Sequence, residues 1–233
     1  MKKLSGFLIV VLFAMLTVAA WGYANRPTSE PALPRVIHGF AFQPYQKDQD
    51  AIAGEDPTSA QIDADLKLLA GTTRAVRTYS SIGTLGEIPA LARKHGLKVM
   101  LGSWIDSDRE RNDREVEAAI RLANTNRNVT RILIGNEVVL RGDLPVEDLI
   151  AHLDRVRAAT KQPVSTAEPW HVWIKHPELV AHVDFITVHM LPYWEGVEVE
   201  AAVGYVVARL GEVRDAFPGK PIVLAEVGWP SNG

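Results

Sequence analysis

Short apolar segments alternate with amphipathic segments along the chain from residue 36 onward. The apolar segments are often rich in β-branched residues, and several are bounded by glycine or proline. This pattern is typical of parallel strands that are buried on both faces. It predicts strands at residues 36–42, 75–80, 98–104, 129–136, 163–168, 185–191 and 221–227.

Between these segments, apolar residues recur at intervals of three and four, which predicts helices with one buried face. The first helix is expected to begin with Ser59 as its N-cap and to end at Gly71. Alternating strands and helices indicate a parallel sheet, either doubly wound and open or closed as a barrel. The other helices are expected at residues 114–126, 146–160 and 198–217.

Two features favour the barrel. The first strand segment, HGFAFQPYQ, has no glycine-rich loop of the kind that binds a dinucleotide or phosphate. Polar and aromatic residues instead follow the C-terminal ends of the strands, where (β/α)8 barrels keep their active sites. We therefore expect an α/β fold of the TIM (β/α)8 barrel type, truncated after its seventh strand. Because GWPSNG follows that strand directly, we expect the chain to be a fragment of a longer one.

The N-terminus has a different character, because Lys2 and Lys3 precede an almost uninterrupted apolar run at residues 4–23. That length is close to the ~20 residues that cross a bilayer, so the run predicts an export signal, either cleaved or kept as a membrane anchor. In both cases the remainder of the chain is expected to be exported. The predicted organisation is an export or anchor helix at 1–24, a Pro-rich linker at 25–35 and a barrel at 36–233.

Composition narrows the choice of partners and cofactors. A net charge of −3 and a pI near 6.2 provide no basic surface, so nucleic acid is not an expected partner. The absence of cysteine excludes disulfides, thiolate metal sites and a cysteine nucleophile. No H-E-x-x-H motif is present, and neither a metal nor another cofactor is expected. His38, His171 and His189 follow separate strands, which leaves a metal-dependent hydrolase as an alternative.

Three predicted strands run directly into glutamates. RILIGNE delivers Asn136 and Glu137 to the rim of the barrel, IVLAEV delivers Glu226, and STAE delivers Glu168. The fourth and seventh strands lie well apart around a barrel mouth, so their carboxylates can face each other. Two carboxylates that flank a bond are what glycoside hydrolysis requires. Spacing alone does not choose the pair among the three glutamates.

Aromatic residues also follow the strands. Beyond the apolar N-terminus, all five tryptophans follow strand ends and none lies in a predicted helix. Aromatic rings pack against the C–H faces of sugars, so an aromatic rim suits a glycan groove. Asp106, also at the rim, is expected to be a structural hydrogen-bonding residue. The candidate substrate-binding residues are Asn136, Arg77, Tyr79, Glu168, Trp170, His189, Tyr193, Trp194, Trp229 and Trp104, and Trp173 completes the set of five tryptophans.

The pair ILIGNE and LAEVGWPS resembles the signature of family 17 glycoside hydrolases, which act on β-1,3-glucans. The resemblance extends from IHGFAFQPYQ through VRTYS, STAEPWHVW and VHMLPYW, and it is strongest with the bacterial branch. It implies that Glu137 is the acid/base and Glu226 the nucleophile of a retaining mechanism, with Asn136 on the sugar 2-hydroxyl. Members of the family continue past the seventh strand, which is where this chain departs from the pattern.

The expected function is therefore a retaining hydrolase or glucanosyltransferase of β-1,3-glucan, with a β-glucan as its partner. The N-terminal helix would contact a membrane if it remains uncleaved. The alternative is a barrel that binds β-glucan without turnover. Arg77 is expected to help keep Glu226 ionised, because a neighbouring positive charge favours the charged form of a carboxyl group.

Overall fold

The computed structural model describes residues 2–26, 36–51 and 53–230 and divides into two compact units, Met1–Arg35 and Val36–Gly233. In the first unit, helix α1 (Lys2–Ala24) contains the predicted apolar run. Its segment Gly6–Ala24 is long and apolar enough to cross a membrane, and a signal sequence near an N-terminus has the same properties. Most of the predicted linker, at 25–35, lies outside the described residues.

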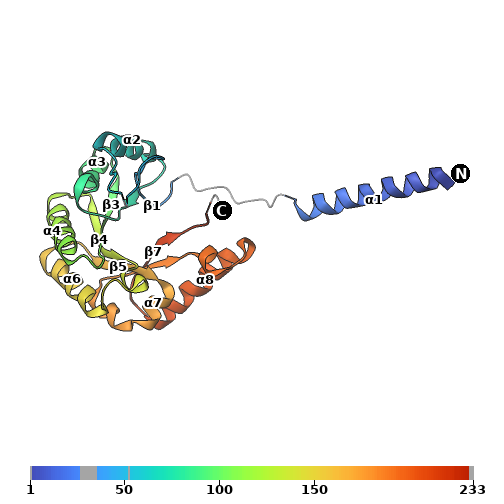
Figure 1. Cartoon of the computed structure of the whole chain (residues 1–233). Helices are drawn as coiled ribbons and strands as arrows, with labels where there is room; N and C mark the ends of the chain where they lie inside the picture. The colour runs from blue at the N-terminus through green and yellow to red at the C-terminus, as the bar shows by residue number, and fades with distance from the viewer. Residues whose placement is uncertain (1, 27–35, 52, 231–233) are drawn as a thin grey trace. The chain divides into compact units, whose positions relative to one another are not determined.

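The second unit is a curled parallel sheet of seven strands, with helices around its outer face (Figure 1). Neighbours in the sheet are neighbours in the sequence, and every pair is parallel, so the prediction of a parallel α/β barrel is confirmed. Among the described residues, β1 and β7 form the two edges. The strands are β1 (Phe40–Ala41), β2 (Ala75–Arg77), β3 (Lys98–Ser103), β4 (Val129–Asn136), β5 (Val164–Pro169), β6 (Ile186–Met190) and β7 (Ile222–Val227).

The second strand ends earlier than its apolar pattern predicts, because the segment that follows it forms hydrogen bonds with the side chain of Glu115. Beyond Arg77 the hydroxyl of Ser80 and the backbone amide of Ser81 donate to the buried carboxylate of Glu115, the latter at 2.7 Å. These bonds take the chain out of the sheet shortly after β2 ends. They also position the loop that follows Tyr79 at the C-terminal end of the barrel.

Helices connect consecutive strands, and two predictions about them need correction. Ser59 is the first residue of α2 rather than its cap, because Thr58 caps the helix and forms a capping box with Gln61. A helix after β2, α3, was missed because it has only seven residues. The helices are α2 (Ser59–Leu69), α3 (Ile88–Lys94), α4 (Arg109–Thr125), α5 (Val138–Arg141), α6 (Val146–Ala159), α7 (Trp170–Lys175) and α8 (Val199–Ala216), with 3-10 turns at Gly83–Glu87, Pro177–His182 and Pro192–Glu195.

The core has two parts, one between the sheet and its helices and one inside the curl of the sheet. The inner part is small and consists of Leu133, Ala167 and Phe185, with three partly buried neighbours. Trp173 belongs to the outer part, where it is fully buried and donates from Nε1 to the carbonyl of Thr187 at 3.0 Å. The expectation that none of the five tryptophans lies in a helix is therefore wrong, since Trp170 and Trp173 are both in α7, and the buried Trp173 does not belong to the rim.

Candidate active site

Glu226, near the end of β7, is the centre of a polar cluster inside the barrel mouth. Its Oε1 atom accepts hydrogen bonds from the guanidinium of Arg77 and, at 2.6 Å, from the hydroxyl of Tyr79. The Arg77 guanidinium also lies 3.9 Å from the centre of the Tyr79 ring. Arg77 ends β2 and Tyr79 follows it closely, so two side chains of one segment hold one carboxylate.

These neighbours determine the charge of Glu226. Burial alone would raise the pKa of this carboxyl group. The charges of His189 and Arg77 and the hydrogen bonds from Tyr79 and Arg77 act in the opposite direction and leave the pKa below its ordinary value. Burial also raises the pKa of Tyr79, so its hydroxyl stays a donor. Glu226 is therefore an anion at neutral pH, as a nucleophile must be.

Glu137 directly follows β4 and has an unusual backbone conformation. Its φ is 57°, the only positive φ of a non-glycine residue in the described part of the chain. Its backbone amide donates to the carbonyl of Ala167 on the neighbouring strand at 2.7 Å. This turn bends the chain from strand into the single helical turn α5. It also directs the Glu137 side chain toward His189, whose Nδ1 lies 2.8 Å from Oε1 of Glu137.

His189 joins the two glutamates. It lies on β6 with 1% of its surface exposed, and while Nδ1 contacts Glu137, Nε2 lies 3.6 Å from Oε1 of Glu226. One imidazole ring thus touches both carboxyl groups, so the two groups face the same small space. Asn136 adjoins this space, because its Oδ1 accepts from Arg77 at 2.6 Å. The structure therefore brings together six of the predicted residues: Arg77, Tyr79, Asn136, Glu137, His189 and Glu226.

The third candidate, Glu168, is placed differently. It is fully buried at the end of β5 and accepts from the backbone amides of Val139 at 2.9 Å and Leu140 at 3.3 Å. Burial raises the pKa of Glu168 to about 7, the two amide bonds oppose the rise, and the charge of Glu137 adds to it. Its partners are backbone groups of α5, whereas Glu137 and Glu226 both meet His189.

Aromatic side chains form a platform beyond the carboxylates. The ring of Tyr193 meets those of Trp194 and Trp229 edge to face, at centroid distances of 5.1 Å and 5.5 Å. Trp194 is 75% exposed, so a large apolar surface faces solvent at this point. Such a surface is what the C–H face of a sugar ring would cover. The three residues follow β6 and β7, and β7 is the strand that carries Glu226.

Trp170 is fixed by residues that sequence reasoning missed. Its Nε1 donates to both carboxylate oxygens of Glu195, at 3.2 Å and 3.0 Å, and Tyr205 donates to the same carboxylate. The guanidinium of Arg209 lies 4.7 Å from the Trp170 ring centre and 5.1 Å from that of Tyr205. Tyr205 and Arg209 are four residues apart on α8, so their shared face was visible in the sequence, although its partner was not.

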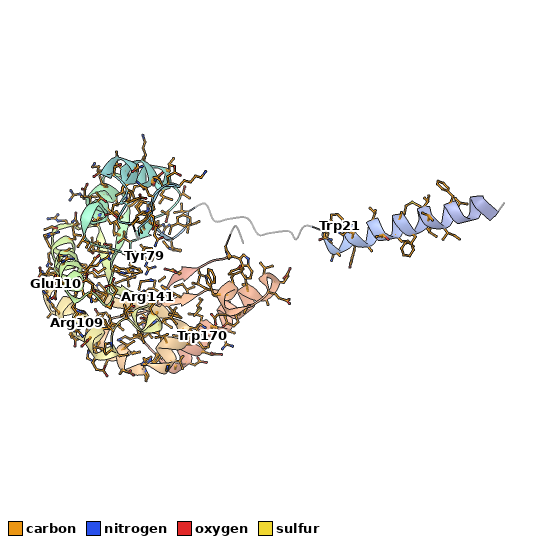
Figure 2. The ribbon with its side chains drawn as sticks, viewed as in Figure 1. Trp21, Tyr79, Arg109, Glu110, Arg141 and Trp170 are labelled. Atoms are coloured by element: carbon orange, nitrogen blue, oxygen red, sulfur yellow. The ribbon has the colours of Figure 1, made fainter. Side chains whose placement is uncertain are left out.

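Trp104 is packed by a second arginine. The guanidinium of Arg141 lies 4.5 Å from its ring centre and also donates to the carbonyls of Asn136 and, at 2.9 Å, Ile105. Asp106 accepts from Trp104 Nε1 at 3.1 Å, which agrees with its expected structural part. Figure 2 shows that Tyr79, Arg141 and Trp170 come from three different parts of the barrel.

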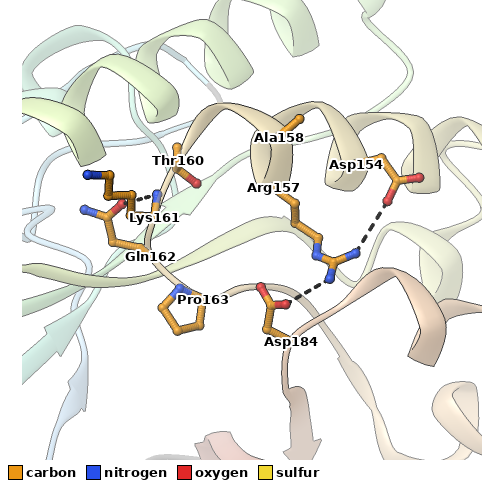
Figure 3. A pocket seen from close by; sticks show the side chains of 8 residues that line it. All are labelled: Asp154, Arg157, Ala158, Thr160, Lys161, Gln162, Pro163 and Asp184. Carbon is orange, nitrogen blue, oxygen red and sulfur yellow. Dashed lines mark hydrogen bonds and ion pairs between the residues drawn. The ribbon is translucent and has the colours of Figure 1, made fainter.

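A cavity of about 550 Å³ lies far from this chemistry. It is at the opposite end of the strands, since two of its lining residues, Pro163 and Asp184, come just before β5 and β6. Arg157 of α6 forms ion pairs with Asp154, one turn earlier in the same helix, and with Asp184 (Figure 3). This cavity is therefore separate from the cluster around Glu226. No group of three or more potential metal-ligating side chains occurs within the described ranges.

Gly135 allows the turn at Glu137 to form. Its φ is 86°, and a Cβ there would lie 2.5 Å from Cγ2 of Val138 and 3.4 Å from Oγ1 of Thr166. We expect Gly135→Ala to lower the free energy of unfolding by roughly 2–4 kcal/mol, from backbone strain plus overpacking. Gly142→Ala is the control, because Gly142 also has a positive φ, 70°, but an added Cβ would meet nothing within 4 Å. Urea unfolding of both variants checks this, and equal losses would contradict the overpacking.

A curled parallel sheet with two glutamates next to one imidazole at its C-terminal end defines an α/β-barrel with paired carboxyl groups, an arrangement that glycosidases use. A sequence model of the BtgE/BtgC glycoside hydrolase domain matches residues 39–233, and the chain belongs to that family. The resemblance to family 17 is thereby confirmed, while the similarity to its bacterial branch stays a prediction.

Relatives and a solved structure agree with this assignment. The chain is 26% identical to a probable glucan endo-1,3-beta-glucosidase, btgC, of Aspergillus flavus, over 91% of this chain and 34% of that protein. It is 30% identical to the glucan 1,3-beta-glucosidase of Schizosaccharomyces pombe, over 73% of this chain and 59% of that protein. The chain thus spans only part of these relatives' length.

The solved structure is a family 17 β-1,3-glucanosyltransferase from Rhizomucor miehei, also determined as an active-site mutant with laminaritriose. The mutant complex matches this chain with a TM-score of 0.72 and 28% identity. The match covers 83% of this chain and 72% of that one. Likeness over this share of both chains supports the barrel fold independently of the sequence motifs.

Proposed function

We propose that the protein is a retaining glycosidase of β-1,3-glucan, acting by hydrolysis or by glucanosyl transfer. The observation that carries the proposal is the position of His189, 2.8 Å from Glu137 and 3.6 Å from Glu226, because it directs two carboxyl groups into one space. The choice of glucan is supported by the relatives, whose names specify 1,3-β-glucan or its transfer.

The two glutamates divide the reaction between them. The carboxylate of Glu226, kept ionised by Arg77 and Tyr79, attacks the anomeric carbon. The carboxyl group of Glu137 donates its proton to the glycosidic oxygen, so the bond to the leaving sugar breaks and a glycosyl ester forms on Glu226. Glu137, now a carboxylate, takes a proton from water or from a sugar hydroxyl, which attacks the ester and releases the product with retained configuration.

The residues around the two glutamates serve substrate binding in this proposal. Asn136 is oriented by Arg77 and lies next to Glu137 in the chain, which suits a bond to the sugar 2-hydroxyl. The ring faces of three aromatic residues beyond the carboxylates offer a surface for a sugar ring. These residues are Tyr193, Trp194 and Trp229.

Two further tryptophans support binding through rings that are held in place. Arg141 packs against Trp104, and Arg209 packs against Trp170, so both rings are fixed before a substrate arrives. Glu168, the remaining predicted binding residue, has its carboxylate buried against backbone amides. We therefore do not include Glu168 among the groups that contact the sugar.

Product analysis tests the proposal. The complete gene product is incubated with a β-1,3-linked gluco-oligosaccharide, and the anomeric configuration and length of the products are recorded. Retained configuration is expected, with shorter products from hydrolysis and products longer than the substrate from transfer. Binding without any product would overturn the proposal and support a non-catalytic glucan-binding barrel. Activity lost to a chelator and restored by a divalent ion would support a metal-dependent hydrolase instead.

We also propose that α1 directs export and serves either as a cleaved signal or as a membrane anchor. The length and hydropathy of Gly6–Ala24 support this, together with the two lysines before it. Fractionation of the producing cells, with N-terminal sequencing of the recovered protein, separates the outcomes. Intact protein in the membrane fraction indicates an anchor, a shortened protein outside the cytoplasm indicates cleavage, and cytoplasmic protein contradicts export.

A further inference from the structure

The backbone of Glu137 is held in a costly conformation. At φ 57° a residue other than glycine is disfavoured, because its Cβ crowds the following carbonyl oxygen. Such a turn persists only when surrounding contacts hold it. The position of the Glu137 carboxyl group depends on this turn, because a different φ would move the side chain away from Nδ1 of His189.

Two consecutive residues of β5 supply the contacts. The carbonyl of Ala167 accepts from the amide of Glu137 at 2.7 Å, just before the turn continues into α5. The Glu168 carboxylate then accepts from the amides of Val139 and Leu140, at 2.9 Å and 3.3 Å, one on each oxygen. The end of β5 therefore binds the backbone on both sides of Val138.

The surroundings of Glu168 match this use of its carboxylate. Its side chain has 0% of its surface exposed, and each carboxylate oxygen is engaged with a backbone amide. No sugar can reach a group that is covered in this way without displacing α5. Burying a carboxylate costs free energy unless the group is well hydrogen-bonded. The cost of burying Glu168 must therefore be offset by the stabilisation that it gives to the backbone it binds.

We propose that Glu168 is a positioning residue for the proton donor of the reaction, acting through α5 to hold Glu137 against His189. This inference rests on the proposed function. Glu168 touches neither the sugar nor the reacting atoms. It fixes the amides of residues 139 and 140, and so keeps the turn that presents the Glu137 carboxyl group to the glycosidic oxygen.

A positioning role of Glu168 and a general contribution of Glu168 to folding predict different effects on two kinds of substrate. In the first step of the reaction, a misplaced Glu137 slows departure only of those leaving groups that need a proton, whereas the later attack of water on the ester needs Glu137 as a base for every substrate. Departure of a sugar needs general acid catalysis, which is worth about 10²–10⁴-fold. Departure of dinitrophenolate needs none, because that anion is stable without a proton. The attack by Glu226 is common to both reactions.

Glu168→Gln tests the inference in the complete gene product. Glutamine keeps the shape but offers one acceptor, and its amino group would face an amide N–H of α5. The loss in kcat/KM expected for a β-1,3-gluco-oligosaccharide is about 10–10²-fold, part of the full general-acid effect. With the dinitrophenyl glycoside of the same oligosaccharide, kcat/KM for release of dinitrophenolate, which does not include the later base-catalysed step, should stay within about 3-fold of the wild-type value. The ratio of the two rates does not depend on how much of the variant is folded.

A double-mutant cycle adds a second measurement. In a Glu137→Gln background, Glu168→Gln should cause no further loss on the oligosaccharide, because the group that it positions is already gone. Glu168→Asp, which keeps the charge, is measured alongside in case the glutamine variant folds poorly. Equal losses on both substrates, unchanged activity, or additive losses in the cycle overturn the inference. A wild-type protein inactive on both substrates overturns the proposed function instead.

Discussion

Glu226→Gln is expected to abolish turnover of β-1,3-gluco-oligosaccharides by the complete gene product, with a loss on the order of 10⁴-fold or more, because the amide cannot form the glycosyl ester. The structure concentrates two donors, Arg77 and Tyr79, on one oxygen of this carboxylate. Those donors stabilise a negatively charged carboxylate much more than they would stabilise a neutral amide. Initial rates at saturating substrate measure the effect.

Two further variants complete this test. Glu117→Gln is the control, since Glu117 is an exposed residue of α4 paired with Arg155 at the surface, and its activity should equal that of the wild type. Glu226→Gly with an activated aryl glycoside and added azide should form the glycosyl azide of inverted configuration, because azide attacks the anomeric carbon where the carboxylate no longer does. Full activity in Glu226→Gln would end the assignment of the nucleophile.

The stability of the fold is expected to fall as the pH rises from about 5 to 8, and Glu115 is a principal cause. Burial raises the pKa of Glu115 from 4.5 to about 7, although Ser80 and Ser81 donate to its carboxylate. Between these two values the folded chain holds a proton that the unfolded chain has lost, so stability decreases with increasing pH. At about 1.4 kcal/mol for each pKa unit, the contribution is roughly 3 kcal/mol.

Glu115→Gln should remove the part of this dependence that Glu115 contributes, while Glu168, whose pKa is also raised to about 7, keeps its own part. At pH 5 the variant should be as stable as the wild type, because an amide and a protonated carboxyl group are alike in charge and shape. At pH 8 it should be the more stable of the two, by up to roughly 3 kcal/mol. Urea unfolding at several pH values measures both, and Glu117→Gln again serves as the exposed control on the same helix. A variant less stable than the wild type at pH 8 shows that the bonds from Ser80 and Ser81 outweigh the burial.

Elements with a strong local pattern were predictable from the sequence. Strand β4 has the predicted bounds, because its apolar run is long and ends abruptly at a polar pair. The apolar pattern predicts a strand at residues 75–80, but β2 ends at Arg77. The hydrogen bonds from Ser80 and Ser81 to Glu115 end it there, and they join residues that are 35 and 34 positions apart. No local pattern contains such contacts.

In the candidate site, too, local patterns were predictable from the sequence and long-range contacts were not. Three strand-end glutamates were visible as a set, but the sequence did not choose among them. The structure separates them by their partners, since His189 contacts two of the glutamates and the amides of α5 bind the third. The positive φ of Glu137 could not be predicted from the sequence either, because asparagine and aspartate are the usual non-glycine residues in that conformation.

The two edge strands of the sheet, β1 and β7, affect how the protein behaves in solution. In the described residues neither β1 nor β7 has a second neighbour, and Leu224 and Val227 of β7 are substantially exposed. An edge strand that exposes apolar side chains is a template for pairing with another chain, so concentrated solutions of this polypeptide should self-associate. Dilute, cold handling and early light-scattering checks are advisable before any kinetic experiment on the isolated chain.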